Sequence, residues 1–379
     1  MNTRKIRIGI TGQAGFVGTH LFNTIGLRAK QFEAVPFEDD YFSSTFALQE
    51  FVKKCDVIVH LAAVNRSNDP DELYTTNVQL VEKLIAAMEA EQVTPFVVFT
   101  SSIQEKLDNP YGRSKVKGRE IFEAWAKRNS ASFVGLIVPN VFGPFCKPNY
   151  NSFIATFSWR LTHNELPEII NDSKVQLIYI NSLCTYILQV IEDRINTHGC
   201  YQIEVPYDIE RTVSSVLDSL KNYKDLYFVN GIIPVLSDSN DVALFNTFRS
   251  YIDIESFFPR KLKVNSDDRG TFVETIRLGI GGQVSFSTTF PGITRGNHYH
   301  TRKIERFTVI KGKALIALRK IGTNQVYSFE LNGEEPAYVD MPIWYTHNIT
   351  NIGSDELYTQ FWINEWYDEA NPDTYFEKV

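Results

Sequence analysis

The sequence predicts a Rossmann-type α/β domain with a doubly wound parallel sheet, followed by an all-β barrel. Short apolar segments alternate with helical patterns through the first part of the chain, and a glycine-rich turn follows the first apolar segment. Closely spaced strand-like segments fill the C-terminal part. Alternating strands and helices are typical of parallel sheets covered on both faces, whereas many short strands with glycine and proline turns are typical of barrels and sandwiches.

The strands expected in the first domain are four apolar segments rich in Val, Ile and Phe, namely Ile6–Ile10, Val57–Leu61, Phe96–Thr100 and Phe133–Val138. Such segments fit strands that are buried on both faces. Helical patterns lie between them, for example over Tyr74–Glu89 and Tyr111–Lys127. We expect this domain to span residues 1–245 and a linker to span residues 246–262.

The second domain, residues 263–379, is predicted from strand-length segments that follow one another at short intervals. They are Val284–Phe290, Arg306–Ile310, Ala314–Lys320, Gln325–Leu331, Ala337–Met341 and Glu356–Asn364. Glycine and proline residues separate them, as in an all-β barrel.

The composition of the 379 residues is that of an ordinary globular protein. The chain has 38 Lys+Arg against 45 Asp+Glu, a net charge of −7, which argues against a nucleic-acid partner. Positive charge is expected locally, at Lys115, Arg113 and Lys147. The four cysteines are scattered, and the sequence has no apolar run of transmembrane length. We therefore expect a cytoplasmic protein without a membrane partner.

The first candidate site begins at Gly12–Gly18, which directly follows the first strand and opens a helix. Gly12 would form the tight turn, Gly15 would let the backbone approach a pyrophosphate, and Gly18 would let helix and sheet pack closely. The phosphates would then meet unpaired N–H groups at the helix N-terminus. This context predicts a dinucleotide site.

A second group of residues adds proton chemistry. Tyr111 and Lys115 lie four residues apart and share one face of a helix that Pro110 begins. An ammonium beside a phenol is expected to lower the pKa of the phenol. Ser101 and Ser102 end the preceding strand, where either hydroxyl could donate to a substrate carbonyl while Tyr111 protonates it.

These motifs resemble the extended, sugar-nucleotide-modifying branch of the short-chain dehydrogenase/reductases. The segments occur in that family's order: GxxGxxG, His60–Ala63, Asn77, Thr100–Ser102, YxxxK and Pro139–Gly143. The resemblance implies a Ser–Tyr–Lys trio for the proton and a nicotinamide for the hydride, with Ser102 the first choice for the serine and Ser101 the second. It implies the following cofactor-binding residues: Gly12, Gln13, Gly15, Phe16, Val17, Gly18, Leu61, Ala62, Tyr111 and Lys115.

The second candidate site consists of three histidines and a glutamate. His298 and His300 are spaced to point the same way along a strand, Glu305 begins the next strand, and His347 comes from a later turn. These nitrogen and oxygen donors suit Zn, Ni, Fe or Mn.

The same stretch resembles the cupin family. The first cupin motif, G-x5-H-x-H-x4-E-x6-G, runs from Gly292 to Gly312, and Pro342, His347 and Asn351 meet the second. Trp344 replaces the glycine of the second motif, so the turn there is open to question. A metal in such a barrel could act as a Lewis acid on a substrate oxygen.

The order of the two halves resembles CapF-like enzymes of capsular polysaccharide synthesis. That resemblance implies C3 epimerisation of a UDP-2-acetamido-2,6-dideoxy-4-hexulose in the cupin, then NADPH-dependent reduction at C4 to the L-talose derivative, with one divalent metal, Zn, and a homodimer. The acidic segment Glu38–Asp40 favours NAD instead, so NADH stays possible. His300, Glu305 and Lys303 are candidates for the epimerisation base. Two alternatives are a non-catalytic sugar-nucleotide-binding protein and a reductase whose cupin only dimerises.

Overall fold

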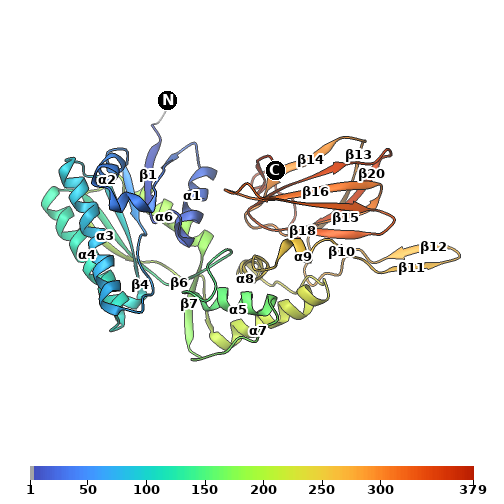
Figure 1. The fold of residues 1–379 in the computed structure, drawn as a ribbon, viewed down its shortest axis with the longest axis horizontal. Helices are drawn as coiled ribbons and strands as arrows, with labels where there is room; N and C mark the ends of the chain where they lie inside the picture. The colour runs from blue at the N-terminus through green and yellow to red at the C-terminus, as the bar shows by residue number, and fades with distance from the viewer. Residues whose placement is uncertain (1–3) are drawn as a thin grey trace. The chain divides into compact units, whose positions relative to one another are not determined.

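The computed structural model describes residues 4–379, which form two compact units (Figure 1). Of these residues, 4–156 and 169–213 make the first unit, and 157–168 and 214–379 make the second. This division differs from the predicted boundary, because residues 214–245 group with the C-terminal strands. Contacts inside the second unit explain the difference: the Tyr227 hydroxyl donates to Asp340 at 2.8 Å, and an Arg306 N–H donates to the Gly231 carbonyl at 3.2 Å.

A six-stranded parallel sheet forms the centre of the first unit, as predicted. Its strand order is β2 (Phe32–Val35), β1 (Ile6–Thr11), β3 (Val57–His60), β4 (Phe96–Ser102), β5 (Ser132–Val138) and β8 (Gly199–Glu204). All of its pairings are parallel. The chain runs outward from β1 to β2 and then returns to β3, so the strand order reverses between β1 and β3. In open α/β sheets, ligands bind at the carboxyl ends of the strands at such a reversal.

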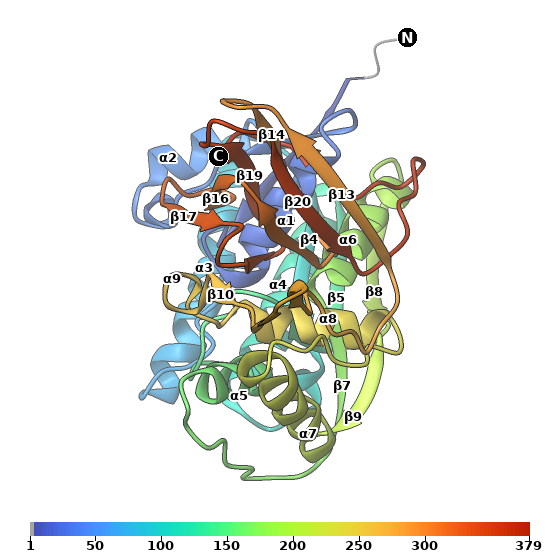
Figure 2. The same ribbon diagram turned by 90° about the vertical axis from the view of Figure 1, so that its right-hand side faces the viewer.

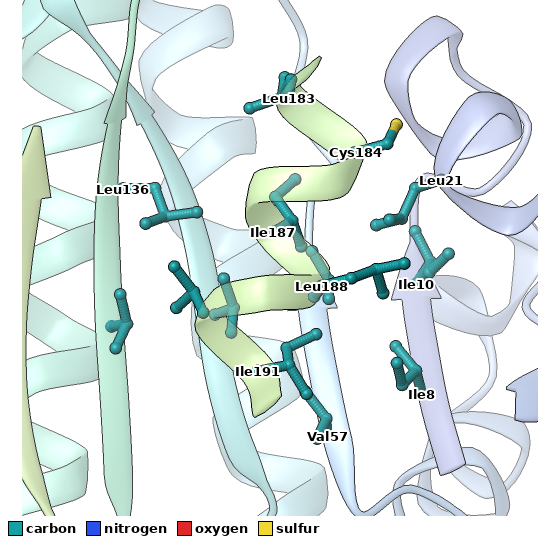
Figure 3. Close-up of a cluster of buried hydrophobic side chains, with 14 of the residues drawn as sticks. Ile8, Ile10, Leu21, Val57, Leu136, Leu183, Cys184, Ile187, Leu188 and Ile191 are labelled. Carbon is teal, nitrogen blue, oxygen red and sulfur yellow. The ribbon is translucent and has the colours of Figure 1, made fainter. Parts of the chain in front are cut away.

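Helices cover both faces of this sheet. Helices α1 (Phe16–Leu27) and α6 (Ile180–Arg194) pack on one face, where Figure 3 shows Leu21, Ile187 and Ile191 against Ile8, Ile10 and Val57. On the other face lie α2 (Thr45–Val52), α3 (Pro70–Ala90) and α4 (Pro110–Asn129). The valine- and isoleucine-rich strands are therefore buried on both sides, which is why they read as continuous apolar runs.

A small three-stranded sheet completes the first unit. Its order is β6 (Asn140–Phe142), β7 (Lys174–Tyr179) and β9 (Ile209–Thr212), with β6 and β7 parallel and β7 and β9 antiparallel.

The second unit holds two five-stranded antiparallel sheets, in agreement with the predicted all-β region (Figure 2). The first sheet runs β10 (Arg260–Lys261), β18 (Ala337–Met341), β15 (Glu305–Lys311), β20 (Leu357–Ile363) and β13 (Gln283–Thr289). The second runs β17 (Val326–Asn332), β16 (Lys313–Lys320), β19 (Tyr345–Asn351), β14 (Thr294–Tyr299) and β21 (Tyr375–Phe376). Strands β11 (Val264–Asp267) and β12 (Gly270–Val273) form a separate exposed hairpin.

Helical segments precede these sheets within the second unit. They are most of α5 (Phe153–Thr162), α7 (Val213–Tyr223), a π-helical turn at Lys224–Val229, α8 (Ser239–Arg249) and α9 (Ile254–Phe257). The Arg306 guanidinium, 2% exposed, makes two hydrogen bonds to the buried Asp340 carboxylate and lies over the Tyr338 ring. Because Tyr227 donates to the same carboxylate, this cluster fastens the helical segment to the sheet. Among residues 4–379, no helix is long and apolar enough to span a membrane.

Candidate functional site

The glycine turn after β1 lies beside the end of β3, at the reversal of strand order. Gly12 has a φ of +71°, and a Cβ there would lie 2.9 Å from the Ala62 backbone, so only glycine allows this approach. At Gly18 a Cβ would lie 2.2 Å from the carbonyl oxygen of Gly12. At Gly12 the positive φ agrees with the expected tight turn, whereas at Gly18 the close approach is to the backbone of the turn itself.

Helix α1 begins with N–H groups that no side chain caps. Gly15 is the N-cap residue and makes no side-chain hydrogen bond to the helix, so the first turn, with Phe16 and Val17, offers backbone donors to an anion. The Gln13 side-chain oxygen accepts instead from the N–H of Phe37, just after β2. The turn is thus tied to the segment in which a dinucleotide ribose is expected.

Two residues that sequence reasoning left unassigned hold the ends of β1 and β3 together. The Thr11 hydroxyl lies 2.8 Å from His60 Nδ1, and both residues are buried. The Ala62 N–H donates to the same hydroxyl at 3.4 Å, and the Leu61 N–H donates to the Thr11 carbonyl at 3.2 Å. Burial lowers the pKa of His60 to about 3, so this imidazole is neutral. No catalytic pattern marks these residues in the sequence.

Helix α4 carries Tyr111 in its first turn and Lys115 one turn later. The Asn109 side chain accepts from the Gly112 N–H at 2.7 Å, and Pro110 follows in the first turn, so the helix start is fixed. Lys115 is buried, and its ammonium donates to the Thr100 carbonyl at 3.0 Å. The side chain of Lys115 thereby reaches the end of β4.

The pKa values of this pair differ from the expectation. Burial raises the pKa of the Tyr111 phenol to about 12, with Tyr150 adding to the increase, and burial lowers the pKa of Lys115 to about 8. The expected lowering of the Tyr111 pKa was wrong, because the Lys115 ammonium lies 5.6 Å from the ring centroid and hydrogen-bonds Thr100. Tyr111 is therefore a protonated acid at neutral pH.

The two serines at the end of β4 are engaged differently. The Ser101 hydroxyl donates to Glu105, whose carboxylate is also held by Arg119 at 2.9 Å. The Ser102 hydroxyl accepts from the Gln104 N–H at 3.2 Å, which leaves its own proton for donation. This difference supports Ser102 over Ser101 as the hydroxyl that could donate to a substrate carbonyl.

Asn77 links the Tyr–Lys helix to the loop after β3. Its side-chain oxygen accepts from the Val64 N–H at 2.7 Å, and its amide donates to the Ser114 hydroxyl at 3.0 Å. Ser114 in turn donates to the Tyr111 carbonyl at 2.8 Å. The sequence motif names Asn77, but only the fold reveals this bridge.

The predicted metal ligands come together between the two sheets of the second unit. His298 and His347 are cross-strand partners on β14 and β19, Glu305 begins β15 of the other sheet, and His300 follows β14. One ligand atom from each of the four lies within 4.8 Å of the others. Glu305 Oε2 is 3.1 Å from both His300 Nε2 and His347 Nε2.

The chemistry of this donor set fits a divalent cation. His300 Nδ1 donates to the Asp373 carbonyl at 2.6 Å, which turns Nε2 toward Glu305. His347 is fully buried, and its Nε2 faces the same carboxylate. Burial would raise the pKa of Glu305, but the neighbouring His300 and His347 outweigh it and hold the pKa well below its usual range. A buried carboxylate facing three imidazoles is the donor set that Zn and similar ions bind.

The turn before His347 keeps its shape without a glycine. Trp344 has a φ of +62°, the left-handed conformation that glycine adopts easily, and its N–H donates to the His300 carbonyl at 2.8 Å. Its buried ring stacks on Tyr299 with the centroids 5.7 Å apart. Packing and this hydrogen bond stabilise the turn that the missing glycine had put in question.

Comparison with known proteins agrees with this two-part arrangement. Residues 8–203 match the NAD dependent epimerase/dehydratase family, and residues 265–375 match the polysaccharide biosynthesis C-terminal domain. The chain is 35% identical over 372 residues to the UDP-2-acetamido-2,6-beta-L-arabino-hexul-4-ose reductase of Pseudomonas aeruginosa, with 98% of each chain covered. The chain therefore belongs to the NAD dependent epimerase/dehydratase family.

Within this family the similarity to one protein extends over the whole chain. The crystal structure of the capsular polysaccharide assembling protein CapF from Staphylococcus aureus superposes with a TM-score of 0.62 at 32% identity, covering 99% of this chain and 100% of that one. RMD of Pseudomonas aeruginosa, solved with NADPH, shares the fold of 58% of this chain at 17% identity and a TM-score of 0.53. The chain is thus CapF-like over its whole length.

Proposed function

We propose that the protein is a bifunctional sugar-nucleotide enzyme of polysaccharide biosynthesis. In this proposal the second unit epimerises a UDP-2-acetamido-2,6-dideoxy-4-hexulose at C3, and the first unit reduces the C4 ketone to give the L-talose derivative. The observation that carries the proposal is the joint presence of Tyr111 and Lys115 at a dinucleotide turn and a buried His/Glu cluster, in a chain related to a 4-hexulose reductase. A non-catalytic binding protein would need neither set of side chains.

The reductive half follows from the side chains of the first unit. The Gly12 turn would hold a nicotinamide cofactor, which would supply the hydride for a carbonyl carbon. Ser102 donates a hydrogen bond to the carbonyl oxygen, and Tyr111 transfers its proton to that oxygen as the hydride arrives, giving the alcohol. Lys115, held by Thr100, places its ammonium 5.6 Å from the Tyr111 ring centroid, where its positive charge would oppose the effect of burial as the tyrosinate forms. Tyr111 is protonated at neutral pH, as the acid in a reduction must be at the start.

The epimerase half is proposed for the antiparallel sheets of the second unit, which we interpret as a cupin barrel. His298, His300, Glu305 and His347 would hold one divalent metal, preferably Zn. Such an ion supplies Lewis acidity toward a substrate oxygen, which makes a proton next to a ketone easier to remove. Lys303 is less suited to be the base than the sequence suggested, because its amino group donates to the Pro372 carbonyl at 2.5 Å.

NADPH is the cofactor that we propose. In NAD-binding sheets an acid near the end of the second strand holds the ribose hydroxyl. Here β2 ends at Val35, Pro36 and the buried Phe37 follow, and Glu38–Asp40 are exposed at the start of a 3₁₀ turn. An acidic side chain therefore does not directly follow β2, which supports NADPH over NADH. Titration of the protein with both cofactors should give tighter binding of NADPH, and equal or tighter binding of NADH would contradict this choice.

A homodimer is also part of the proposal. The isolated hairpin exposes 43% of Val264 and 70% of Phe272, and the edge strand β13 exposes 70% of Phe286. A lone two-stranded hairpin is at best marginally stable in water, so a second copy covering these side chains is favoured. Light scattering should give twice the 43.4 kDa chain mass. A mass of one chain at micromolar concentration would contradict the dimer.

The enzymatic proposal is tested by incubating the UDP-4-keto sugar with NADPH and following the absorbance of NADPH. Tyr111→Phe should lower the rate by about 10²–10⁴-fold, the usual contribution of a general acid. Tyr201→Phe is a matched control, because it removes an exposed phenol, outside the proposed site, that donates to the His198 carbonyl. Unchanged NADPH consumption in Tyr111→Phe would refute the reductase assignment.

The epimerase half has its own variant. His347→Ala should abolish exchange of the C3 proton with solvent deuterium while NADPH binding stays intact. The control is His198→Ala, which changes an exposed histidine outside the cluster. Native exchange in His347→Ala would contradict a role for the cluster.

A further inference from the structure

The C-terminal segment contains a buried acid, Asp373. Within residues 4–379, its hydrogen-bond partners lie around the proposed metal site. Asp373 is 2% exposed, and its side chain is fully buried. It follows Pro372 in the segment Asn371–Phe376, and its φ is +41°, in the left-handed region. Non-glycine residues adopt this conformation uncommonly, although aspartate does so more readily than most.

The carboxylate of Asp373 accepts hydrogen bonds from the backbone of the turn between the proposed ligands His300 and Glu305. It accepts from the N–H groups of Thr301 at 3.1 Å, Arg302 at 3.0 Å and Lys303 at 3.1 Å, and from the Thr301 hydroxyl at 2.7 Å. These are the first three of the four residues that connect His300 to Glu305. The carboxylate therefore fixes the path of the chain from one ligand to the other.

The main-chain carbonyl of Asp373 contacts the proposed ligand His300 directly. It accepts from His300 Nδ1 at 2.6 Å. Because a carbonyl can only accept, the proton of the imidazole is held on Nδ1, and Nε2 faces Glu305. The left-handed backbone of Asp373 lets its carbonyl and its carboxylate point at one turn together.

The neighbouring residues keep Asp373 in place. The Lys303 amino group donates to the Pro372 carbonyl, and the Arg302 guanidinium donates to the Asn371 carbonyl at 2.9 Å. Strand β21 then pairs with β14, with Phe376 opposite His298. Both ends of the segment are thus anchored on residues at or beside the proposed ligands.

We propose that Asp373 is a positioning residue for the metal site, and that the C-terminal segment 371–376 orients His300 and Glu305 for a divalent cation. Outer partners of metal-binding histidines fix the tautomer and the direction of the ring, and their loss commonly lowers metal affinity by about 10–100-fold. This inference rests on the metal site of the proposed function. It adds a residue that touches neither metal nor substrate.

The test is the zinc affinity of the full-length protein, measured by competition with a chromophoric chelator. Asp373→Ala should raise the dissociation constant by about 10–100-fold, and Asp373→Asn, which keeps one side-chain oxygen, by less. The matched control is Asp368→Ala, in the same C-terminal region, where the exposed carboxylate accepts from the nearby Ala370 N–H at 2.9 Å. This control should bind zinc with native affinity.

Two further readouts separate positioning from general stabilisation. A purely structural role would lower the unfolding midpoint of the metal-free protein but leave the zinc affinity of the folded chain unchanged. A positioning role should also alter the d–d absorption bands of the cobalt-substituted protein, which report ligand geometry. If Asp373→Ala does not fold, Asp373→Asn carries the test, with the same direction expected.

The outcomes are distinct. A folded Asp373 variant with native zinc affinity and a native cobalt spectrum would overturn this inference and leave the proposed metal site standing. A native protein that binds no divalent cation would overturn the metal site itself, and the inference with it. Weakened affinity in Asp373→Ala but not in Asp368→Ala would support both.

Discussion

Replacing Gly18 by alanine tests the dinucleotide turn by adding a single carbon atom to it. The added Cβ would lie 2.2 Å from the Gly12 carbonyl oxygen and 2.8 Å from the Gln13 Cα. Both contacts are with backbone, so the turn itself must shift rather than a flexible side chain. Overpacking of this kind costs about 1–3 kcal/mol. If this energy destabilises the conformation of the turn that binds the cofactor, NADPH affinity should fall by about 5–150-fold.

Gly26→Ala is the matched control on the same helix. A Cβ at Gly26 has no neighbour within 4 Å, and the residue is exposed. The substitution should leave NADPH binding unchanged and stabilise the helix by about 0.5–1 kcal/mol. Binding is measured by the fluorescence of NADPH, and folding by thermal unfolding of both variants. A folded Gly18→Ala protein with native NADPH affinity would refute the role assigned to this turn.

Two further predictions concern stability and pH. Asp340→Asn leaves the buried Arg306 guanidinium without its charged partner. The free energy of unfolding of the second unit, measured with denaturant, should fall by about 3–5 kcal/mol. A loss below about 1 kcal/mol would contradict the role of this cluster in holding the helical segment to the sheet. Burial lowers the pKa of Lys115 to about 8, so its positive charge is present below pH 8 and lost above it. The rate of ketone reduction should therefore fall as pH rises through about 8, and a rate that stays level to pH 10 would contradict a role for the ammonium.

Local sequence patterns were sufficient to predict the parallel sheet and an all-β C-terminal region, whereas barrel closure stays a prediction. The strands of the first unit are buried on both faces, which leaves uninterrupted apolar runs such as Val57–Val59. The glycine turn could also be predicted from the sequence, because the backbone geometry requires glycine at positions 12 and 18. The four members of the His/Glu cluster were found from their spacing, and the structure brings them together. Their metal-binding role stays a prediction.

Other features depended on tertiary contacts that spacing does not encode. The lowered pKa expected for Tyr111 was wrong, because burial outweighs a lysine whose ammonium hydrogen-bonds Thr100. Helical residues 214–245 group with the C-terminal strands through buried contacts such as Tyr227 to Asp340. Asp373 lies far along the chain from the turn that it holds. Only the fold shows that these distant residues meet.

The most direct test of the bifunctional proposal is one reaction run in D2O with native protein, the UDP-4-keto sugar and NADPH. The proposal predicts that the product carries deuterium at C3, that its configuration at C3 is inverted, and that one NADPH is consumed for each ketone reduced. NMR of the purified product gives the first two results, and absorbance gives the third. Oxidation of NADPH with an unlabelled C3 of retained configuration would contradict the account.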